Sequence, residues 1–436
     1  MTLQKLLERF LGTCVRLSFE REQPFVICVA GSVGKTSTKT AIGVALGADE
    51  PGSRVVTSQK NYNNEIGVPL TVFGCDAPGR SLIAWSILLG KALLTRWGVL
   101  PLRAKIFVLE MGVDRPGDLA YLTSIAQPNV GVLTAIGPEH TEFFGSIENV
   151  AGEEITILRA LKPDGVAVLN GDDEMIRTIS QGLRTNVFSF GTAEDATARI
   201  VEHHLVIDEQ SPEASGIETR LSMMGTSWTI RLTGTVGRPQ AYAVAAALAV
   251  VSAIDGEEAQ ALDRIQKRFH GMPGRMRLVE GIKRTWLIDD SYNSSPLAAL
   301  SALRDLAAFP IREGAQRIAA LGDMLELGNL AEPSHEEIGR AVAESNIDVL
   351  VACGALAHIV VNAAIAARMP RDNIFTFADS REAGLFIQAR LREGDVVLVK
   401  GSQGGRMERV TKELMAHPER AGELLVRQAK EWLEKE

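Results

Sequence analysis

Cysteine is scarce in this sequence and nowhere clustered. Among 436 residues only Cys14, Cys28, Cys75 and Cys353 are cysteines, and they form no Cys-x-x-Cys pair and no Cys/His ligand spacing. Disulfide frameworks and structural zinc sites both depend on such spacings, so neither is indicated. The pattern suits a reducing compartment, and we expect a cytoplasmic protein.

An excess of positive charge is also missing. The chain has 46 lysine and arginine residues against 54 aspartate and glutamate residues, a formal net charge of -8. General nucleic-acid binding depends on clustered cations that neutralise phosphates, so we expect no nucleic-acid partner. An acidic protein can still bind a phosphate group at one local site.

No uninterrupted apolar run is long enough to cross a membrane. The longest apolar window begins at Ser81 and is broken by Lys91 and Arg96, and the N-terminus lacks the apolar core of a signal peptide. The window and the N-terminal segment are both predicted helices that pack against the body of the protein. The alternative is a weak contact with a membrane surface, without stable insertion. In the N-terminal segment the apolar residues at helical spacing are Leu3, Leu6, Leu7, Phe10 and Leu11.

The order of apolar and amphipathic segments predicts an α/β protein. A chain of this length is expected to form two or three domains. Short runs rich in valine and isoleucine, such as FVICVA and KIFVLEMG, alternate with amphipathic stretches, which is typical of a parallel sheet flanked by helices. Residues 186–233 differ, and we expect them to form a small antiparallel extension.

A second α/β series follows a segment rich in glycine, proline and arginine. This segment, residues 268–280, is predicted to be an interdomain linker. We therefore predict a short N-terminal helical segment (1–22), a P-loop central domain with a parallel sheet (23–272) and a Rossmann-like C-terminal α/β domain (273–436).

The stretch AGSVGKTS, from Ala30 to Ser37, predicts a polyphosphate-binding loop. Its glycines let backbone N–H groups turn inward, Lys35 can reach the β- and γ-phosphate oxygens, and Thr36 can offer its hydroxyl to Mg2+. The eight-residue Walker pattern has a glycine where this chain has Val29, and a chance glycine-rich turn is the alternative interpretation. The predicted ATP-binding residues of the loop are Gly31, Ser32, Gly34, Lys35, Thr36 and Ser37.

Two residues at strand ends extend this predicted site. A phosphate loop alone does not separate a GTPase from a kinase or an ATP-driven ligase, but the chain has no NKxD guanine-reading motif. Glu110 ends an apolar strand and His140 follows the next one, where α/β folds gather their ligands. Together they could hold a second Mg2+ between ATP and a substrate carboxylate. Solvated loop residues are the alternative.

Polar residues elsewhere have types that suit nucleotide and substrate contacts. Asn63 and Asn64 could orient phosphate, metal or water, with turn chemistry as the alternative. Asp290 and Asn293 suit a ribose and an adenine edge, with helix capping as the alternative. Arg275 could reach the phosphates when the domains close. Asp323, Lys400 and Ser402 lie at predicted strand ends, with exposed loop polarity as the alternative.

Together these motifs resemble the Mur ligase family, and within it the MurF type. The stretches NNEIGVPLT and LGDMLELG are specific for that type, whereas the phosphate loop is not. The resemblance covers residues 25 to about 410, nearly the whole chain. Its other motifs are GSVGKTSTK, LEMG, HTEFFGSIENVA, LNGDD, PGRM, DDSYNSSP and VLVKGS.

The resemblance implies a two-step ligase reaction. ATP phosphorylates a substrate carboxylate to an acyl phosphate, and an amine then attacks it to form an amide, releasing ADP and phosphate. MurF-type enzymes join D-alanyl-D-alanine to a muramoyl tripeptide in this way. The resemblance implies that Thr36 holds one metal, that Glu110 and His140 hold a second, that Asp290 and Asn293 bind the nucleoside, and that Lys400 and Ser402 lie near the amine.

Three features depart from the MurF pattern. About two dozen residues precede the first predicted strand, where MurF enzymes have a UDP-sugar-binding domain, so UDP recognition is not carried over. Glu154 stands where the family has a lysine that is carbamylated by CO2, and its permanent carboxylate is predicted to take a catalytic and metal-binding role. The family's His-Asn pair after Gly-Arg is Pro-Gln here, which leaves Gln240 as the only nearby amide.

We therefore expect a monomeric, cytoplasmic amide ligase that depends on ATP and Mg2+ and adds a D-Ala-D-Ala-like dipeptide to a cell-wall peptide precursor. One alternative is the same chemistry on a non-UDP or lipid-linked carboxylate. The other is a non-catalytic ATP-binding protein that regulates a partner enzyme. The joint presence of Lys35, Thr36 and a second-metal pair favours an enzyme, although fold analogy alone does not fix the substrate.

Overall fold

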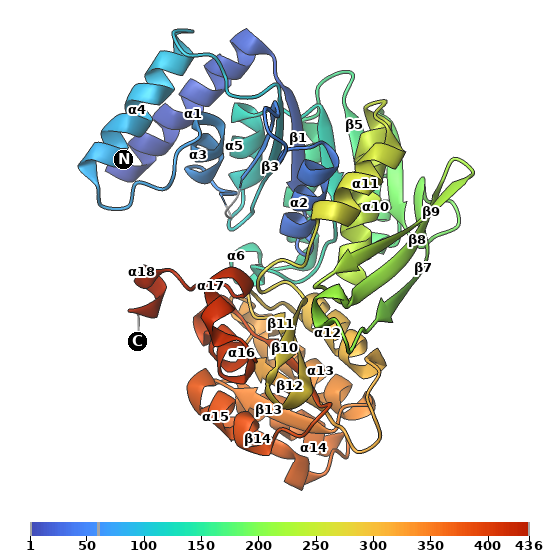
Figure 1. Ribbon diagram of the computed structural model, residues 1–436. Coiled ribbons are helices and arrows are strands. Elements are labelled where there is room, and N and C mark those ends of the chain that lie inside the picture. Colours follow the sequence, from blue (N-terminus) through green and yellow to red (C-terminus); the bar gives the residue numbers. More distant parts are fainter. Residues whose placement is uncertain (1, 59–61, 435–436) are drawn as a thin grey trace.

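The computed structural model describes residues 2–58 and 62–434 and contains two β-sheets, each covered by helices (Figure 1). Residues 59–61, which precede the NNEIGVPLT stretch, lie outside the described residues. In the described part of the chain no helix is long and apolar enough to cross a membrane.

The central sheet has the strand order β2-β3-β1-β4-β5-β6-β7-β8-β9. Pairing is parallel from β2 through β7 and antiparallel between β7, β8 and β9. The strands are β1 (Phe25–Ala30), β2 (Val55–Thr57), β3 (Ile106–Glu110), β4 (Val130–Leu133), β5 (Val166–Asn170), β6 (Asn186–Gly191), β7 (Ala198–Val206), β8 (Gly216–Met223) and β9 (Thr226–Thr233).

The prediction of an antiparallel extension is confirmed for β7 to β9 and was wrong for β6. Residues 186–191 pair in parallel with β5. The reason is the helix α9 (Glu174–Ile179), which lies between β5 and β6 and supplies the crossover that a parallel pair requires. Strand composition alone does not give strand direction.

Helices cover both faces of the central sheet because residues alternate between the faces along each strand. In β1, Val26 and Cys28 join one core and Ile27 and Val29 join the other. The helices of the first core are α1 (Leu3–Glu22), α3 (Gly67–Phe73), α4 (Leu82–Arg96), α5 (Asp118–Ile125), α6 (Thr141–Phe144), α7 (Ile147–Glu154), α8 (Thr156–Arg159) and α9. Those of the second core are α2 (Lys35–Ala45), α10 (Arg238–Ala253) and α11 (Glu258–Arg268).

The second sheet has the order β10-β11-β15-β12-β13-β14, and only β10 is antiparallel to its neighbour. Its strands are β10 (Arg277–Gly281), β11 (Thr285–Asp290), β12 (Arg317–Gly322), β13 (Val349–Cys353), β14 (Ile374–Phe377) and β15 (Val396–Lys400). Helices α12 (Pro296–Ala308), α13 (Ala331–Glu344) and α14 (Ala357–Ala366) cover one face, and α15 (Ser380–Arg390), α16 (Glu408–Leu414) and α17 (Ala421–Leu424) cover the other. A short helix α18 (Lys430–Leu433) follows.

The two domains meet at the carboxyl edge of the central sheet. Of the segment predicted as a linker, residues 269–276 run between α11 and β10, whereas residues 277–280 form β10 itself, so the linker is shorter than predicted. The loop after β4 contacts the second domain. Thr141 Oγ1 donates to the carbonyl oxygen of Leu327 at 3.0 Å, and Gly137 packs against Leu297. The ends of β1, β3 and β4 therefore face the second domain, which places their polar residues between the two sheets.

Candidate active site

The phosphate loop joins β1 to α2, as the sequence predicts. Gly31 has a φ of 123°, and a Cβ at this position would lie 2.4 Å from the Thr134 hydroxyl oxygen, so only glycine fits. Ser32 is tied to the loop after β4, because its hydroxyl donates to the Gly137 carbonyl at 3.1 Å and accepts from the Gly137 N–H at 3.0 Å. Because Lys35 is the first residue of α2, the loop ends at a helix N-terminus, which favours bound phosphate.

Lys35 Nζ is enclosed by oxygen atoms. It donates to carbonyl oxygens of the phosphate loop, including that of Gly31, and lies 3.4 Å from Glu139 Oε2. Burial lowers the pKa of Lys35, but the charges of Glu139, Glu154 and Glu110 outweigh burial and hold this pKa above its usual value. Lys35 is therefore a fixed cation beside the phosphate loop.

Glu110, the last residue of β3, is held by three neighbours. Its Oε1 accepts hydrogen bonds from Thr36 Oγ1 and from Asn63 Nδ2, each at 3.2 Å. Its Oε2 lies 3.5 Å from Lys39 Nζ, and both of these side chains are buried. Burial lowers the pKa of Lys39, and the charge of Glu110 opposes that fall. The structure thus brings the predicted residues Thr36, Asn63 and Glu110 into direct contact.

Glu154 ends α7 and is buried beside the phosphate loop. Burial raises the pKa of its carboxyl group to about 7, although Lys35 and the backbone of Gly31 act in the opposite direction. Glu154 is thus a carboxylate that can gain or lose a proton near neutral pH. The charge of Lys35 and the backbone of Gly31 both act on this carboxyl group, so Glu154 lies next to the phosphate loop, and its catalytic and metal-binding role stays a prediction.

These groups fit a hard divalent cation. Within residues 2–58 and 62–434, the buried atoms Glu110 Oε2 and Glu154 Oε2 have no hydrogen-bond partner, and the Thr36 hydroxyl lies next to Glu110. Mg2+ prefers oxygen ligands and is commonly bound by one or two carboxylates together with substrate phosphates. The same ranges contain no group of three or more His, Cys, Asp or Glu side chains that could hold a metal by themselves.

His140 joins the two domains. Its Nδ1 lies 2.8 Å from Glu326 Oε2 of the second domain, and its Nε2 lies 3.7 Å from Asp114 Oδ1, in the loop after β3. Its φ of 54° makes it the left-handed residue that precedes α6. His140 thus contacts the loop after β3 and the second domain, and its pairing with Glu110 around a second metal stays a prediction.

Arg275 crosses from the linker to the phosphate loop. Its Nη2 donates to Thr36 Oγ1 at 3.2 Å, and its guanidinium carbon lies 4.2 Å from the centre of the Tyr292 ring. The Gln240 side chain donates to the carbonyl oxygen of Arg275 at 3.1 Å. Gln240 belongs to the Pro-Gln pair that stands where the family has His-Asn. It is buried, and its side chain supports the backbone of Arg275.

The predicted nucleoside residues lie together at the carboxyl edge of the second sheet. Asp290 Oδ2 lies 2.5 Å from Lys400 Nζ, and this nitrogen also donates to the Asn293 carbonyl oxygen at 3.0 Å. Asn293 Nδ2 lies 3.4 Å from Glu139 Oε1, which reaches across from the central domain. Lys400, predicted near the amine substrate, is therefore in direct contact with both predicted nucleoside residues.

Three other predicted residues bind backbone groups. Asn64 Oδ1 accepts from the Gly67 N–H at 2.9 Å at the start of α3. The Asp323 carboxylate accepts from two N–H groups that precede α14, at 2.9 and 3.0 Å. Ser402 Oγ accepts from the Leu325 N–H at 3.0 Å. The Asn64 contact matches the alternative of turn chemistry. Asp323 is half-buried and Ser402 is buried, so neither is the exposed loop residue of their alternative.

Sequence reasoning missed two charged residues of this site, Glu139 and Lys39. Glu139 directly precedes His140, and it contacts both Lys35 and Asn293. Lys39 lies four residues after Lys35 on α2, close to one helical turn. The second lysine of GKTSTK and the glutamate of GPEH were the sequence signals from which these two residues could have been predicted.

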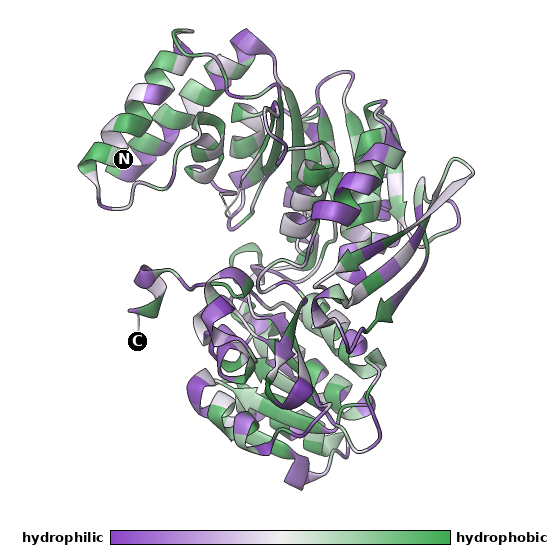
Figure 2. Ribbon diagram, viewed as in Figure 1, coloured by the Kyte–Doolittle hydropathy of each residue, from purple (hydrophilic) through white to green (hydrophobic). Residues whose placement is uncertain are grey.

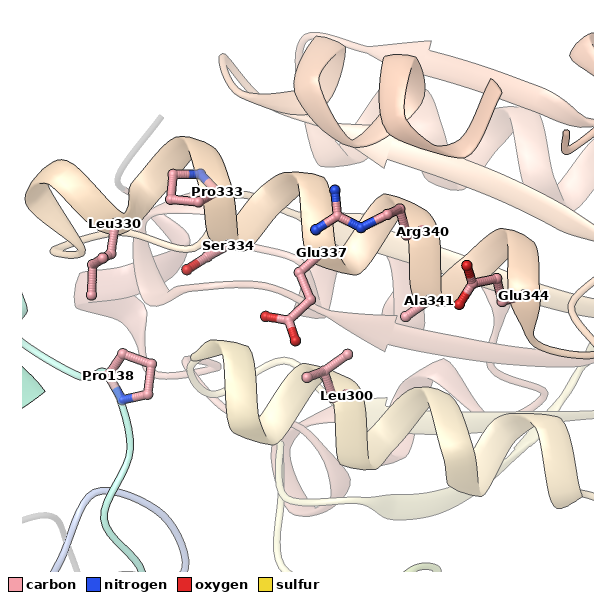
Figure 3. Close-up of a pocket in the computed structure, with 9 residues that line it drawn as sticks. All are labelled: Pro138, Leu300, Leu330, Pro333, Ser334, Glu337, Arg340, Ala341 and Glu344. Carbon is pink, nitrogen blue, oxygen red and sulfur yellow. The ribbon is translucent and has the colours of Figure 1, made fainter. Parts of the chain in front are cut away.

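A surface pocket lies near the domain junction. Figure 3 shows side chains of α13 facing a hollow whose opposite wall includes Leu300 of α12 and Pro138 of the loop after β4. Glu337 and Arg340 contribute charges, but the pocket contains none of the residues predicted as site residues. It is therefore distinct from the phosphate loop.

Two family descriptions match this chain. The Mur ligase middle domain matches residues 94–251, and the Mur ligase glutamate ligase domain matches residues 274–403. The UDP-N-acetylmuramoyl-tripeptide–D-alanyl-D-alanine ligase of Bacillus subtilis is 28% identical over 394 residues, which are 90% of this chain and 76% of that protein. The Escherichia coli protein of the same name is 26% identical over 89% of this chain and 76% of its own length.

Solved structures agree with these relatives. The MurF ligase of Thermotoga maritima in complex with ADP is 25% identical, has a TM-score of 0.73, and is matched over 93% of this chain and 83% of its own. A MurF structure from Acinetobacter baumannii has a TM-score of 0.74 over 92% and 79% of the two chains, and at 24% identity it shows the fold alone. The chain therefore belongs to the Mur ligase family of ATP-dependent ligases that form carbon–nitrogen bonds, and within the family it is similar to the MurF type.

Proposed function

We propose that this chain is an ATP-dependent ligase that joins D-alanyl-D-alanine to a muramoyl-peptide precursor of peptidoglycan. The observation that carries the proposal is the contact of Thr36 with Glu110 beside the enclosed cation of Lys35. A phosphate loop with a carboxylate at the neighbouring strand end suits phosphoryl transfer. The two relatives from Bacillus subtilis and Escherichia coli, which are named for these substrates, match 90% and 89% of this chain.

The proposed reaction has two steps. A carboxylate oxygen of the precursor attacks the γ-phosphorus of ATP, the bond from that phosphorus to the bridging oxygen breaks, and ADP leaves. The dipeptide nitrogen then attacks the acyl carbon, forms the amide, and releases inorganic phosphate and one proton. Lys35 and the N–H groups of the phosphate loop stabilise the phosphoryl oxygens, where negative charge is concentrated during the first step.

Mg2+ is proposed to bind at the phosphate loop. Thr36 and Glu110 would hold it, and Glu154 contributes a second buried carboxylate whose Oε2 has no partner in the described part of the chain. When bound, Mg2+ supplies positive charge that polarises the phosphoryl oxygens. His140 is proposed as a further ligand through Nε2, with its Nδ1 held by Glu326.

The second domain is proposed to bind the nucleotide and to bring Arg275 to the phosphates. Asp290 and Asn293 present polar groups at the carboxyl edge of the second sheet, and Lys400 holds both in place. Arg275 already reaches Thr36, so its guanidinium is positioned for a phosphate oxygen. Asn64, Asp323 and Ser402 stay predicted contacts of nucleotide or substrate, with side chains that also accept hydrogen bonds from backbone N–H groups.

We propose the domain boundaries 1–22, 23–272 and 273–436, a monomer, and a cytoplasmic location where UDP-linked precursors and ATP would be available. The four cysteines are free, which agrees with a reducing compartment.

The test is phosphate release by the purified protein with ATP and Mg2+, in the presence of UDP-muramoyl tripeptide, with and without D-Ala-D-Ala. The expected result is release that requires both substrates, and a product heavier by the dipeptide less water in mass spectrometry. Phosphate release with a lipid-linked tripeptide, but not with the UDP-linked one, would show that the acceptor is lipid-linked. ATP binding without release on any carboxylate would support the non-catalytic alternative and overturn the proposed function.

A further inference from the structure

Large apolar side chains that are exposed to water lie mostly on one part of the central domain. Among the described residues fifteen large hydrophobic side chains are exposed, and nine of them lie in α1, in α4 or in the four residues after α4. Single exposed hydrophobic residues are ordinary, whereas a contiguous group marks an interaction site. We call these nine the α1/α4 surface: Leu3, Leu6, Leu82, Ile83, Ile87, Leu94, Trp97, Val99 and Leu100.

The outer face of α4 is as apolar as its inner face. The inner face packs on the core through Leu88 and Ala92. At 3.6 residues per turn, the exposed side chains from Leu82 to Trp97 fall within an arc of about 140° on the opposite face. Exposed fractions reach 82% at Leu82 and 68% at Trp97. A helix that faces only water on its outer side is expected to be polar there, so this face is suited to an apolar partner.

Helix α1 lies beside α4 and extends the same surface. Two nitrogen atoms of the Arg21 side chain donate to the carbonyl oxygens of Thr95 and Arg96, so the C-terminal ends of the two helices lie together. Figure 1 shows the helices side by side with the N-terminus at their far end, and in Figure 2 both carry hydrophobic colour along their length. The exposed Leu3 and Leu6 therefore lie at the end where α4 begins.

The charge along the α4 side of this surface is of one sign, whereas α1 carries both signs, with Glu20 and Glu22 exposed there. Residues 77–109 contain no aspartate and no glutamate, in a chain whose net charge is -8. The same stretch contains five cations, Arg80, Lys91, Arg96, Arg103 and Lys105. Of these, Arg80, Arg103 and Lys105 are exposed. A surface that is both apolar and locally basic complements a partner with an apolar interior and a negatively charged surface.

We propose that the α1/α4 surface docks this protein on a bilayer that contains anionic phospholipid. Interfacial helices bury an apolar face at the boundary of headgroups and acyl chains, place Trp at that boundary, and use Lys and Arg to contact anionic headgroups. Leu82, Ile83 and Ile87 supply the apolar face, Trp97 supplies the indole, and the cations of 77–109 supply the charge. The helix lies along the surface and does not cross it.

A second copy of this chain suits the surface less well. A two-fold dimer places the same patch of both subunits face to face, so the basic stretch of one copy would meet that of the other. Like charges brought together in this way oppose association. The acidic headgroups of a bilayer have the opposite sign and remove this repulsion.

The experiment is flotation of the full chain with unilamellar vesicles of phosphatidylcholine alone and of phosphatidylcholine with about one third phosphatidylglycerol. We expect binding to the anionic vesicles at 0.1 M salt and at least tenfold weaker partitioning at 0.5 M salt, where the Debye length falls from about 10 Å to about 4 Å. Equal binding to both vesicle types, or binding to neither, overturns the proposal.

The variant pair that tests the surface is Ile83→Asp with Ile87→Asp, at positions 75% and 55% exposed. The matched control is Met224→Asp with Leu385→Asp, at positions 77% and 55% exposed and far along the chain from this surface. We expect the first pair to lose vesicle binding at least tenfold and the control to keep it, with the melting temperatures of both unchanged. Equal binding by the two pairs contradicts the proposal.

Sedimentation of the same protein samples without lipid distinguishes self-association from vesicle binding. Self-association that the first variant pair abolishes, without vesicle binding by the wild type, would identify an interface between copies and overturn the membrane assignment. Failure of the ligase assay leaves this test intact, because vesicle binding is measured without substrate.

Discussion

Lys39 Nζ lies 3.5 Å from Glu110 Oε2, and both side chains are almost fully buried at the carboxyl edge of the central sheet. Lys39 also donates to the carbonyl oxygen and the hydroxyl of Ser58, at 3.0 and 3.1 Å. A charge pair removed from water is stable only while both members are present. Lys39 therefore fixes the carboxylate that contacts Thr36, and acts as a positioning residue.

Replacing Lys39 by methionine is expected to lower the free energy of unfolding by about 3–5 kcal/mol, because Glu110 remains as an unpaired buried charge. The double variant Lys39→Met/Glu110→Gln is expected to recover part of this loss. Urea unfolding followed by tryptophan fluorescence measures both. Lys267→Met, in an exposed pair with Asp263, is the control and should change stability by less than about 1 kcal/mol. Additive effects of the two buried changes would show that the residues are not coupled.

Replacing Lys35 by methionine is expected to lower kcat by a factor of about 100–1000, because the fixed cation beside the phosphoryl group is lost. The measurement is phosphate release at saturating substrates, with ADP binding followed separately by calorimetry. Lys267→Met again serves as the control for a lost lysine charge. A kcat within about twofold of the wild type would remove Lys35 from the proposed mechanism.

Replacing Glu154 by glutamine is expected to raise the Mg2+ concentration needed for half-maximal turnover by about tenfold or more, because an amide oxygen is a weaker ligand than a carboxylate. Bicarbonate should leave the wild-type rate unchanged, since Glu154 needs no carbamylation. Glu153→Gln, the preceding residue on α7, is the control. Unchanged magnesium-dependent turnover in Glu154→Gln would contradict the metal-binding role.

The same substitution is expected to change how stability depends on pH. The folded protein keeps the Glu154 proton up to a pKa of about 7, whereas the ordinary pKa is 4.5. The folded state therefore binds more protons between these values, and the free energy of unfolding falls as pH rises from 4.5 to 7, by up to about 3 kcal/mol. Glu154→Gln should flatten this decline and be the more stable protein at pH 8. Parallel stability curves for the two proteins, from urea unfolding, would contradict the raised pKa.

The parts of the fold that were predictable from sequence are those set by local chemistry. The phosphate loop could be located because Gly31 must be glycine at a φ of 123°, and β1 and β3 because buried strands are continuously apolar. The direction of β6 could not be predicted, since it depends on the short helix α9 before it.

Contacts between the domains were the least predictable part of the site. His140 meets Glu326, which is far away in the sequence, and Asn293 meets Glu139 across the same junction. Such pairs depend on how the domains meet, and no spacing in the sequence encodes that geometry. The supporting role of Gln240 likewise depends on the path of the linker that it contacts.

Arg275 is expected to contribute through the shape of its guanidinium as well as its charge. One nitrogen donates to Thr36 Oγ1 at 3.2 Å while the planar group lies 4.2 Å from the centre of the Tyr292 ring. Lysine keeps the charge but loses the planar stack and the forked donors that suit phosphate. Arg275→Lys should therefore raise the KM for ATP by about tenfold, equivalent to about 1.4 kcal/mol of binding.

Steady-state phosphate release over a range of ATP concentrations measures this effect, with Arg284→Lys as the control. Arg284 is also in the second domain, but its side chain is exposed and its ion pair is with Glu393. An equal rise of the KM for ATP in both variants would show that the effect is not specific to Arg275. An unchanged KM in Arg275→Lys would show that a positive charge at this position is sufficient for ATP binding. A rise confined to Arg275→Lys is expected, because only this arginine reaches the phosphate loop.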